Sequence, residues 1–516
     1  MKIPLDRQSP YPLYLQIRDY LSRLIQSGSL PPAARLPSIR TLSESVQVNK
    51  LTVIEAYGVL EADGLIHARQ GAGYFVNSTA NSTLKLHSTF APAQNVIISE
   101  GGGSFFEQYA ASLQAQQQGK IIDFSSGFPR ASDLDSFQRI AKRAVARSAE
   151  ALFRYDFPQG QLALQQQIVQ MLVQQGLEVS TEELIITNGS EQALSLAIRY
   201  HVQPGDWVIV ETPTYHGALA ILENLGAKVI GIPMTAEGMN LELLEQYLRS
   251  HRPKLIYTIS TLHNPTGITT SQTHRQQLLS LAEHYECPIL EDNAYEGLNF
   301  EPVPAPIKAL DRHDWVTYIS TFSKTLMPGL RVGYMVVTGQ HYRPILEQKI
   351  LQDLHVSTVS QAIVREFLTS GHYRRYLSRL RTSNLQSRNA MLQALERYFP
   401  QQVCWTVPKG GLFLWVHLPN GLPMQVICRE ALAQNILVAS GAAFFPGQQG
   451  YPAMRLNFSH SLAEIERGIL VLGRLLKQHL GLGISAQEPQ LKREPITNIP
   501  FETVTSSDPV SNLIKV

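Results

Sequence analysis

The chain has few cysteines and no long apolar run. Its 516 residues include three cysteines, Cys287, Cys404 and Cys428, which lie far apart and without the spacing of a metal site. This pattern argues against a disulfide-stapled secreted domain and favours reduced thiols. No run of about 18 apolar residues occurs, and no apolar signal segment follows residues 1–4. The sequence therefore predicts a soluble, cytoplasmic protein with no metal site.

The chain also has little excess charge. Its 44 Lys and Arg residues nearly balance 42 Asp and Glu residues, which gives a formal net charge of +2. A generally polycationic nucleic-acid binder is thereby disfavoured, so any DNA site must be local. With 44% hydrophobic residues over this length, two or more globular domains are expected.

Composition and periodicity divide the chain into four segments. Residues 1–76 combine three helical patterns with a hairpin, and residues 77–118 form a linker rich in Ser, Asn, Gln and Gly. Residues 119–478 alternate apolar β-branched runs with amphipathic helices, which predicts an α/β domain with a mostly parallel central sheet. Residues 479–516 have few hydrophobic residues and are predicted to be a disordered tail.

The N-terminal segment predicts a helix-turn-helix followed by a wing. Ser38 is expected to cap a second helix and Asn49 a third, whose Val53, Ala56, Tyr57 and Leu60 face inward. That orientation leaves Lys50, Leu51, Thr52 and Ile54 nearer the open side, where a recognition helix meets the major groove. Residues 65–76, LIHARQGAGYFV, are typical of a two-stranded hairpin with a glycine-rich tip. A helical cap that binds no DNA is the alternative.

Three short motifs in this segment resemble the winged-helix domain of GntR-type bacterial regulators. They are PAARLPSIR at 32–40, VNKLTV at 48–53 and GAGYFV at 71–76. The resemblance implies that phosphates and base edges are contacted by Arg35, Ser38, Arg40, Lys50, Thr52 and Gly71. The family often has Ser-Arg where Asn49-Lys50 stand and a polar residue where Leu51 stands. These departures affect the expected DNA sequence more than DNA binding itself.

A lysine framed by hydroxyl side chains lies in the run STFSKTLMPGLRVGY at 320–334. It is Lys324, and Arg331 follows seven residues later. Such an amine suits Schiff-base formation with the aldehyde of pyridoxal phosphate (PLP), while the hydroxyls and guanidinium suit its phosphate. For a lone lysine, however, a solvated surface position is the commoner explanation.

Polar residues after other predicted strands supply the partners that this cofactor needs. Asp292 follows an apolar strand and suits the pyridine nitrogen, whereas Tyr295 and Asn264 suit the phenolic oxygen. Residues 187–194 open a helix whose free N–H groups suit the phosphate, and Tyr215 suits stacking on the ring. The predicted cofactor-binding residues here are Lys324, Asp292, Tyr295, Asn264, Tyr215, Gly189, Ser190, Glu191, Thr321, Ser323 and Arg331. Their shared position at strand ends predicts one site, because an open α/β sheet binds ligands at that edge.

The set resembles the fold type I, aspartate aminotransferase-like PLP enzymes over about 350 residues. The resemblance implies a smaller C-terminal lobe, an internal aldimine at catalytic Lys324, and a clamp for a substrate carboxylate at Arg455. It also implies that Tyr155 reaches the cofactor phosphate of a neighbouring subunit. Two departures are Gln165, where the family usually has arginine, and Glu191, where a neutral residue is common. The carboxylate of Glu191 would repel the phosphate unless it points away.

The combination of both domains resembles the MocR-type regulators. The resemblance implies a head-to-tail homodimer that binds operator DNA and senses a small amine or PLP through aldimine chemistry, with each winged helix resting against the partner's large domain. A working aminotransferase with an autoregulatory or vestigial DNA-binding module is a second interpretation. A plain repressor whose large domain is only a dimerisation scaffold is the third. The presence of Lys324, Asp292, Asn264, Tyr295 and Arg331 argues against the third, since a scaffold does not need them.

Overall fold

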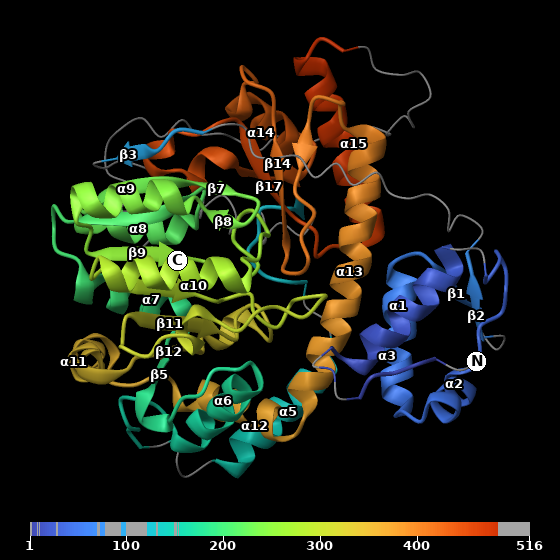
Figure 1. Ribbon diagram of the computed structural model, residues 1–516, viewed down its shortest axis with the longest axis horizontal. Helices are drawn as coiled ribbons and strands as arrows, with labels where there is room; N and C mark the ends of the chain where they lie inside the picture. Colours follow the sequence, from blue (N-terminus) through green and yellow to red (C-terminus); the bar gives the residue numbers. More distant parts are fainter. Residues whose placement is uncertain are drawn as a thin grey trace, which may run out of the picture.

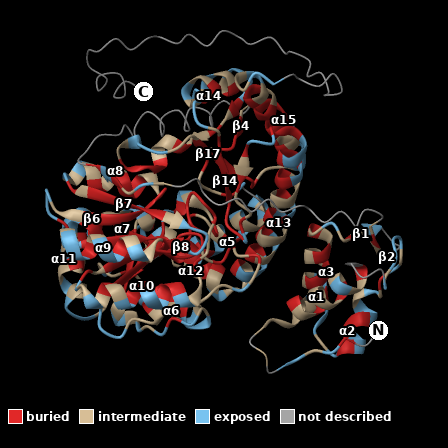
Figure 2. Cartoon of the chain, turned by 45° about the horizontal axis from the view of Figure 1, so that its top comes forward, coloured by how far each residue is buried: buried red, intermediate tan, exposed pale blue. Residues whose placement is uncertain are grey.

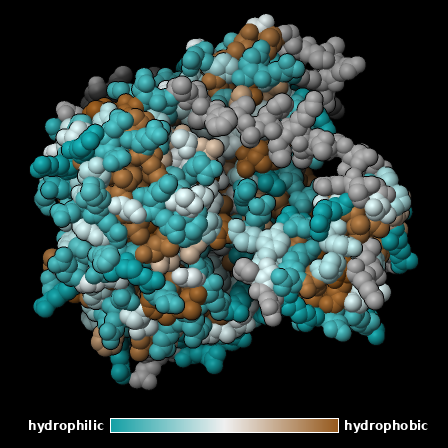
Figure 3. Space-filling model, in the orientation of Figure 1, coloured by the Kyte–Doolittle hydropathy of each residue, from teal (hydrophilic) through white to brown (hydrophobic). Residues whose placement is uncertain are grey.

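The computed structural model of the chain shows a small N-terminal domain beside a large α/β domain that carries a C-terminal lobe (Figure 1). It describes residues 3–7, 9, 11–26, 29–69, 73–77, 94–99, 121–130, 133–148, 152 and 154–482. Among these residues no helix is long and apolar enough to cross a membrane, and no three His, Cys, Asp or Glu side chains are grouped to hold a metal. The predicted tail lies outside the described residues beyond Leu482. Hydrophilic and hydrophobic side chains are interspersed on the face in Figure 3.

The N-terminal domain consists of three helices and a hairpin, as the sequence predicted. Its elements are α1 (Leu13–Gln26), α2 (Ile39–Val46), α3 (Lys50–Ala62), β1 (Ile66–Arg69) and β2 (Gly73–Val76). The side chain of Ser38 caps α2 by accepting from the Thr41 backbone N–H, and that of Asn49 caps α3 by accepting from the N–H of Leu51. One apolar core joins these elements, and it includes Ile17, Leu21, Leu42, Val53, Ala56, Tyr57, Leu60, Ile66 and Val76.

The large domain is built on a mixed sheet with the strand order β3-β7-β6-β9-β10-β11-β12-β5, and β8 pairs with β7 off this path. The strands are β3 (Ile97–Ser99), β5 (Leu184–Thr187), β6 (Trp207–Thr212), β7 (Lys228–Thr235), β8 (Gly238–Met239), β9 (Leu255–Thr258), β10 (Ile289–Asp292), β11 (Val316–Thr321) and β12 (Gly333–Val336). The pairs from β7 through β11 are parallel, whereas β3 and β12 run antiparallel to their neighbours. The predicted α/β class with a mostly parallel sheet is confirmed.

Helices cover this sheet and bury its strands. They are α5 (Leu134–Arg147), α6 (Leu162–Gln174), α7 (Gly189–His201), α8 (His216–Leu225), α9 (Leu241–His251), α10 (Gln272–His284), α11 (Tyr342–Asp353) and α12 (Thr358–Thr369). Figure 2 shows the strands largely buried while the helices expose one side. The central strands read as continuous apolar runs because both of their faces are covered.

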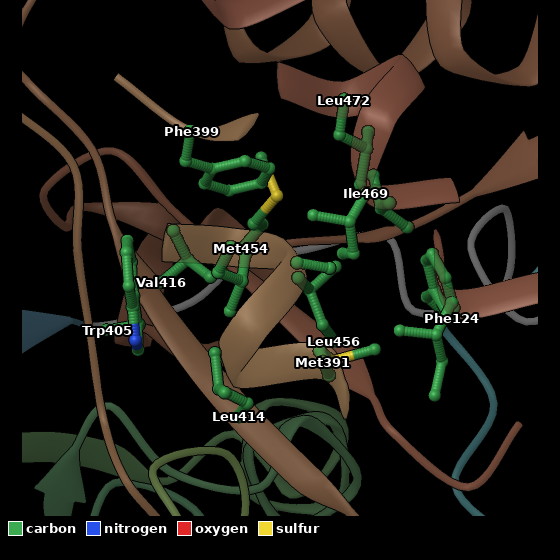
Figure 4. Close-up of a cluster of buried hydrophobic side chains, with 14 of the residues drawn as sticks. Phe124, Met391, Phe399, Trp405, Leu414, Val416, Met454, Leu456, Ile469 and Leu472 are labelled. Carbon is green, nitrogen blue, oxygen red and sulfur yellow. The ribbon is translucent and has the colours of Figure 1, made fainter. Parts of the chain in front are cut away.

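The C-terminal lobe packs three helices against a small sheet of order β13-β14-β17-β16. Its elements are α13 (His372–Tyr398), α14 (Met424–Ala433), α15 (Leu462–His479), β13 (Cys404–Trp405), β14 (Phe413–His417), β16 (Ala439–Ser440) and β17 (Ala453–Asn457), while β15 (Ile436–Leu437) pairs with β4 (Ile122–Asp123). Figure 4 shows its apolar core, where Met391 of α13, Leu456 of β17 and Ile469 of α15 approach one another.

The segment predicted to be a linker contributes to the large sheet. Ile97–Ser99 forms β3, which pairs antiparallel with β7 at the sheet edge. Residues 78–93 and 100–118 of this segment lie outside the described residues. Composition did not reveal the strand because a three-residue edge strand carries almost no periodic signal.

Candidate functional site

Lys324 lies in the turn after β11, and its side chain is partly buried among polar groups. A Cβ built on Gly127 would lie 3.6 Å from Lys324 Nζ, and the same amine lies 5.8 Å from the centre of the Tyr295 ring. Burial lowers the pKa of Lys324 to about 8, and the nearby guanidinium groups of Arg455 and Arg331 act in the same direction. Since the unprotonated amine is the nucleophile, this site makes the lysine more reactive near neutral pH.

Asp292 ends β10 and is held by two hydrogen bonds. The hydroxyl of Tyr257, on neighbouring β9, donates to Asp292 Oδ2 at 2.9 Å, and the backbone N–H of Ala294 donates to Oδ1 at 3.1 Å. Burial raises the pKa of Asp292 to about 6, although the Tyr257 hydrogen bond lowers it. The carboxylate is therefore fixed in direction and still ionised at neutral pH, as a partner for a pyridinium nitrogen must be. Sequence reasoning missed Tyr257 and Gly127.

Arg455, on β17, reaches the same site from the C-terminal lobe. Its Nη1 donates to Asn264 Oδ1 at 2.9 Å, its Nη2 donates to the Ser125 carbonyl, and the guanidinium carbon lies 4.0 Å from the centre of the Phe413 ring. Its Nε is buried without a hydrogen-bond partner among the described residues. Burial lowers the pKa of Arg455 to about 10. A buried cation with an unused donor fits an anionic ligand such as a carboxylate.

A second cationic group faces the N-terminus of α7. Arg331 Nη2 donates to the Asn188 carbonyl at 3.2 Å, and its Nη1 donates to Ser323 Oγ at 3.4 Å. Thr321 Oγ1 donates to Ser323 Oγ at 3.0 Å. A Cβ on Gly189, where φ is 72°, would lie 2.5 Å from Arg331 Nη2, so only glycine lets this guanidinium approach the helix. Hydroxyls, a guanidinium and a helix N-terminus together suit a phosphate. Ser190 follows Gly189 in the first turn of α7.

A buried ion pair on α11 stabilises the turn between β5 and α7 at this anion site. Lys349, fully buried on α11, donates to Asp353 Oδ1 at 2.8 Å, and Asn188 Nδ2 donates to Asp353 Oδ2 at 2.7 Å. Asn188 in turn accepts the Arg331 hydrogen bond through its backbone carbonyl. The chain of contacts fixes the strand-to-helix turn at which a phosphate would bind.

Two predicted residues take positions that the sequence did not specify. Glu191 does not point away from the site, because the hydroxyl of Tyr215 donates to its Oε1. Glu191 also raises the pKa values of Lys324 and Asp292, so its negative charge acts on both groups. Gln165, where the family usually has arginine, is buried and donates to the carbonyls of Gln159, Thr181 and Leu184. Its amide bridges backbone segments and does not face the site.

Tyr155, predicted to reach the cofactor of a neighbouring subunit, is a surface residue of this chain. The side chain is 86% exposed and makes an edge contact with His355, with ring centres 5.7 Å apart. The other predicted cofactor residues lie at the ends of β5, β6, β9, β10 and β11 or in the segments that follow these strands, at one edge of the sheet. The donors and charges gathered there fit PLP: an amine for its aldehyde, a carboxylate for its ring nitrogen and an anion cradle for its phosphate.

Four of the six residues predicted to contact DNA lie on the surface of the N-terminal domain. Arg35, Ser38, Arg40 and Lys50 are exposed, Thr52 is half-buried, and Gly71 lies outside the described residues. Arg40 forms an ion pair with Glu44 at 2.9 Å, and the Ser38 hydroxyl serves as the α2 cap. Arg35 pairs with the wing through a bridge to Phe75. Arg35, Ser38, Arg40 and Lys50 are therefore accessible to solvent, and Arg35 adjoins the wing.

Part of α3 faces the large domain instead of an open surface. Leu51 and Ile54, predicted on the open side, line a hollow that they share with α13, although they are 69% and 45% exposed. Further along, a Cβ on Gly58 would lie 3.7 Å from Thr382 Cγ2, and Asn389 Nδ2 donates to the Ala62 carbonyl. In Figure 1, α3 lies beside α13. The prediction that Leu51 and Ile54 face DNA was made without this tertiary contact.

Comparisons with known proteins match each domain separately and both together. Residues 119–472 match aminotransferase class I and II, and residues 13–76 match bacterial regulatory proteins, gntR family. The uncharacterized HTH-type transcriptional regulator YdfD of Bacillus subtilis is 31% identical, over 93% of this chain and 99% of that protein.

Solved structures resemble the large domain. A multiple substrate aminotransferase from Thermococcus profundus is 31% identical with a TM-score of 0.68, over 74% of this chain and 96% of that one. LysN, an α-aminoadipate aminotransferase from Thermus thermophilus complexed with N-(5'-phosphopyridoxyl)-L-leucine, is 30% identical with a TM-score of 0.67, over 73% and 98%. Aminotransferases of this class and fold are PLP-dependent enzymes.

Proposed function

Because this chain belongs to the class I and II aminotransferase family and carries a gntR-family domain, the combination of the MocR-type regulators, we propose that it is a PLP-dependent transcriptional regulator. In this proposal the N-terminal domain binds operator DNA, and the large domain senses a small amino compound or PLP itself. The observation that supports the proposal is that Lys324, Asp292, Arg331 and Arg455, whose side chains suit PLP and a carboxylate ligand, occur in a chain that also carries a winged helix.

The proposed roles of the site residues follow from their chemistry. PLP, when bound, supplies an aldehyde that condenses reversibly with primary amines. Lys324 offers the amine, Asp292 holds a proton on the ring nitrogen, and Arg331 with Ser190, Thr321 and Ser323 binds the phosphate. Arg455 and Asn264 bind a carboxylate on the amino compound, and Tyr215 and Tyr295 border the ring.

Helix α13 offers a physical connection from this site to the winged helix. The hydroxyl of Tyr373 donates to Thr325 Oγ1, next to Lys324, at 2.9 Å. Nine residues along the same helix, Thr382 packs against Gly58 of α3. At 1.5 Å per residue these contacts are about 13 Å apart along the axis. A displacement of α13 at the lysine loop therefore reaches α3 without passing through another element, which supports coupling between an effector and DNA.

We propose a head-to-tail homodimer as the functional assembly. In this arrangement the α3–α13 contact, which the structure shows within one chain, forms instead between α3 of one chain and α13 of the partner, and Tyr155 reaches the partner's cofactor site. The exposure of the Tyr155 side chain, which leaves it free to contact a second chain, supports this assignment. A Gly58→Cys chain mixed with a Thr382→Cys chain tests it, because the two positions are close enough for a disulfide. A disulfide-linked dimer of twice the mass is expected on a non-reducing gel. If a disulfide forms only within a chain that carries both substitutions, the contact between two chains is refuted.

A working aminotransferase with an autoregulatory or vestigial DNA-binding module is the second candidate. The reactive amine of Lys324 and the buried clamp Arg455 favour it, because both are needed for turnover. Steady-state assays with a panel of amino and 2-oxo acids separate the two. Absence of turnover, together with an amine-dependent change in both absorbance and DNA affinity, supports the regulator.

DNA binding and cofactor binding are tested by two matched pairs of variants. Arg35→Ala is expected to weaken binding to duplexes selected from a random pool by roughly tenfold, while Arg139→Ala on exposed α5 leaves it unchanged. Lys324→Ala is expected to abolish the visible absorption band that PLP forms with the protein, while Lys142→Ala retains it. Equal affinity in the first pair, or an unchanged spectrum in the second, would contradict the respective assignment.

A further inference from the structure

A second cavity lies between the large domain and the C-terminal lobe, apart from the cofactor-type site. Its volume is about 530 Å³, and its lining includes none of the proposed cofactor or carboxylate residues. Thr212, Met234 and Thr266 line it from the large domain, and Trp405 and His417 line it from the lobe. This size and this position between two structural units are typical of small-molecule sites.

The walls of the cavity are mainly apolar and partly aromatic. Met234, Ile268, Val303 and Val407 contribute aliphatic surface, while Trp405, His417 and Tyr451 contribute rings. The rings of His417 and Tyr451 are stacked, with centres 5.2 Å apart, and the Tyr451 hydroxyl accepts from Trp415 Nε1 at 3.0 Å. Such walls favour an aromatic ligand, which gains both burial and ring contacts.

Two polar side chains of the cavity lining can form further hydrogen bonds. Thr212 Oγ1 and His417 Nδ1 are buried and have no hydrogen-bond partner among the described residues. Burial lowers the pKa of His417 to about 4, so its ring is neutral at physiological pH. The charged residues of the lining, Glu237, Glu301 and Lys409, are not buried, and the last two pair with each other at 3.6 Å. A charged ligand would lose its hydration without gaining a buried counter-charge.

We propose that this cavity is a binding site for an uncharged aromatic small molecule that carries a hydrogen-bonding group. It goes beyond the proposed cofactor and amine sites, and its test does not require DNA or PLP. A ligand here contacts both structural units and the 263–268 loop, in which Thr266 Oγ1 lies 2.9 Å from His263 Nδ1 and Asn264 holds Arg455. Binding of a ligand in this cavity therefore favours one spacing of the large domain and the C-terminal lobe, and one position of the Arg455 side chain.

Binding of three probes of similar size to the full chain tests the proposal. Phenol is uncharged and polar, toluene lacks the hydrogen-bonding group, and benzoate is charged; each is titrated by ligand-observed NMR. Saturable binding of phenol is expected, about five- to tenfold tighter than that of toluene and more than tenfold tighter than that of benzoate. Non-saturable binding of phenol, or a preference for benzoate, would overturn the proposal.

Variants locate the probe in the cavity. Val303→Trp, at a half-buried position of the lining, is expected to weaken phenol and toluene binding alike by at least tenfold, while Val359→Trp, at an exposed position of α12, changes neither. Thr212→Val and His417→Phe keep the side-chain shape and are expected to reduce the preference for phenol over toluene to about twofold or less. If Val303→Trp leaves the affinity for phenol unchanged, or if that affinity falls in proportion to added PLP, phenol binds elsewhere and the proposed site is refuted.

Discussion

Removing the Tyr257 hydroxyl should weaken PLP binding in a pH-dependent manner. Tyr257 donates to the buried carboxylate of Asp292 at 2.9 Å, and this bond favours the ionised form. A hydrogen bond to a charged group contributes about 1.5–3 kcal/mol, so Tyr257→Phe should raise the pKa of Asp292 from about 6 to roughly 7 or 8. The substitution leaves the ring in place and removes only the donor.

The size of the loss in PLP affinity depends on the fraction of Asp292 that remains ionised at the pH of the assay. At pH 6.5 a carboxyl with a pKa of about 6 is roughly three-quarters ionised, whereas one with a pKa of roughly 7 or 8 is about 25% or 3% ionised. PLP affinity should therefore fall roughly 3- to 25-fold at pH 6.5 and less than about twofold at pH 8.5. Titration of the apoprotein with PLP, followed by visible absorbance at both values, measures this ratio.

Tyr318→Phe is the matched control. Tyr318 is also a fully buried tyrosine of the central sheet, on β11, but its hydroxyl bonds Glu296 at 3.3 Å instead of Asp292. It should lower stability without changing the pH dependence of PLP affinity. The same loss of affinity at pH 6.5 and 8.5 in Tyr257→Phe would refute the role given to Asp292.

Three further outcomes are expected. Gly189→Ala should reduce PLP affinity at least tenfold by displacing the Arg331 guanidinium, whereas Gly205→Ala, also at positive φ but with open space around it, should leave PLP titrations unchanged. The rate at which Lys324 captures PLP should rise as the pH passes about 8 and then level off, since its amine loses its proton there; a rate independent of pH from 6 to 9 would contradict the burial effect. Asn389→Ala removes the side-chain donor to the Ala62 carbonyl and should increase hydrogen exchange in α3 without changing PLP affinity, whereas unchanged exchange would mean that this contact does not hold the N-terminal domain.

The sequence predicted a single cofactor-type site because its candidate residues come at strand ends or soon after them. Asp292 ends β10, Asn264 and Lys324 come after β9 and β11, and parallel strands bring such positions to one edge. The partners that fix these groups were not predicted. Tyr257 lies inside a continuous apolar strand, where both faces are buried and no alternation marks the side that carries the site.

The position of Glu191 could not be predicted for a related reason. Its charge suggested that it avoids a phosphate site, but the direction of a first-turn helical side chain depends on its tertiary partner. Here the partner is the hydroxyl of Tyr215, which comes from the turn after a different strand. Local sequence patterns predict that Glu191 lies in the first turn of α7, but they do not predict which residue its side chain contacts.

The sequence of α3 indicates a second packing surface, which was not considered when Leu51 and Ile54 were predicted to lie on the open side. Its core stripe is Val53, Ala56, Tyr57 and Leu60, yet Leu51, Ile54, Gly58 and Ala62 form a second apolar or small-residue stripe at helical spacing. A helix with apolar residues on two sides is expected to pack on two sides, and α3 packs on its own domain and on α13. Lys50 and Thr52, which we propose to contact DNA, lie outside both stripes, one on each side of them. In the proposed function a displacement of α13 therefore moves these DNA-contacting residues with it, because they and the stripe that packs on α13 belong to one helix.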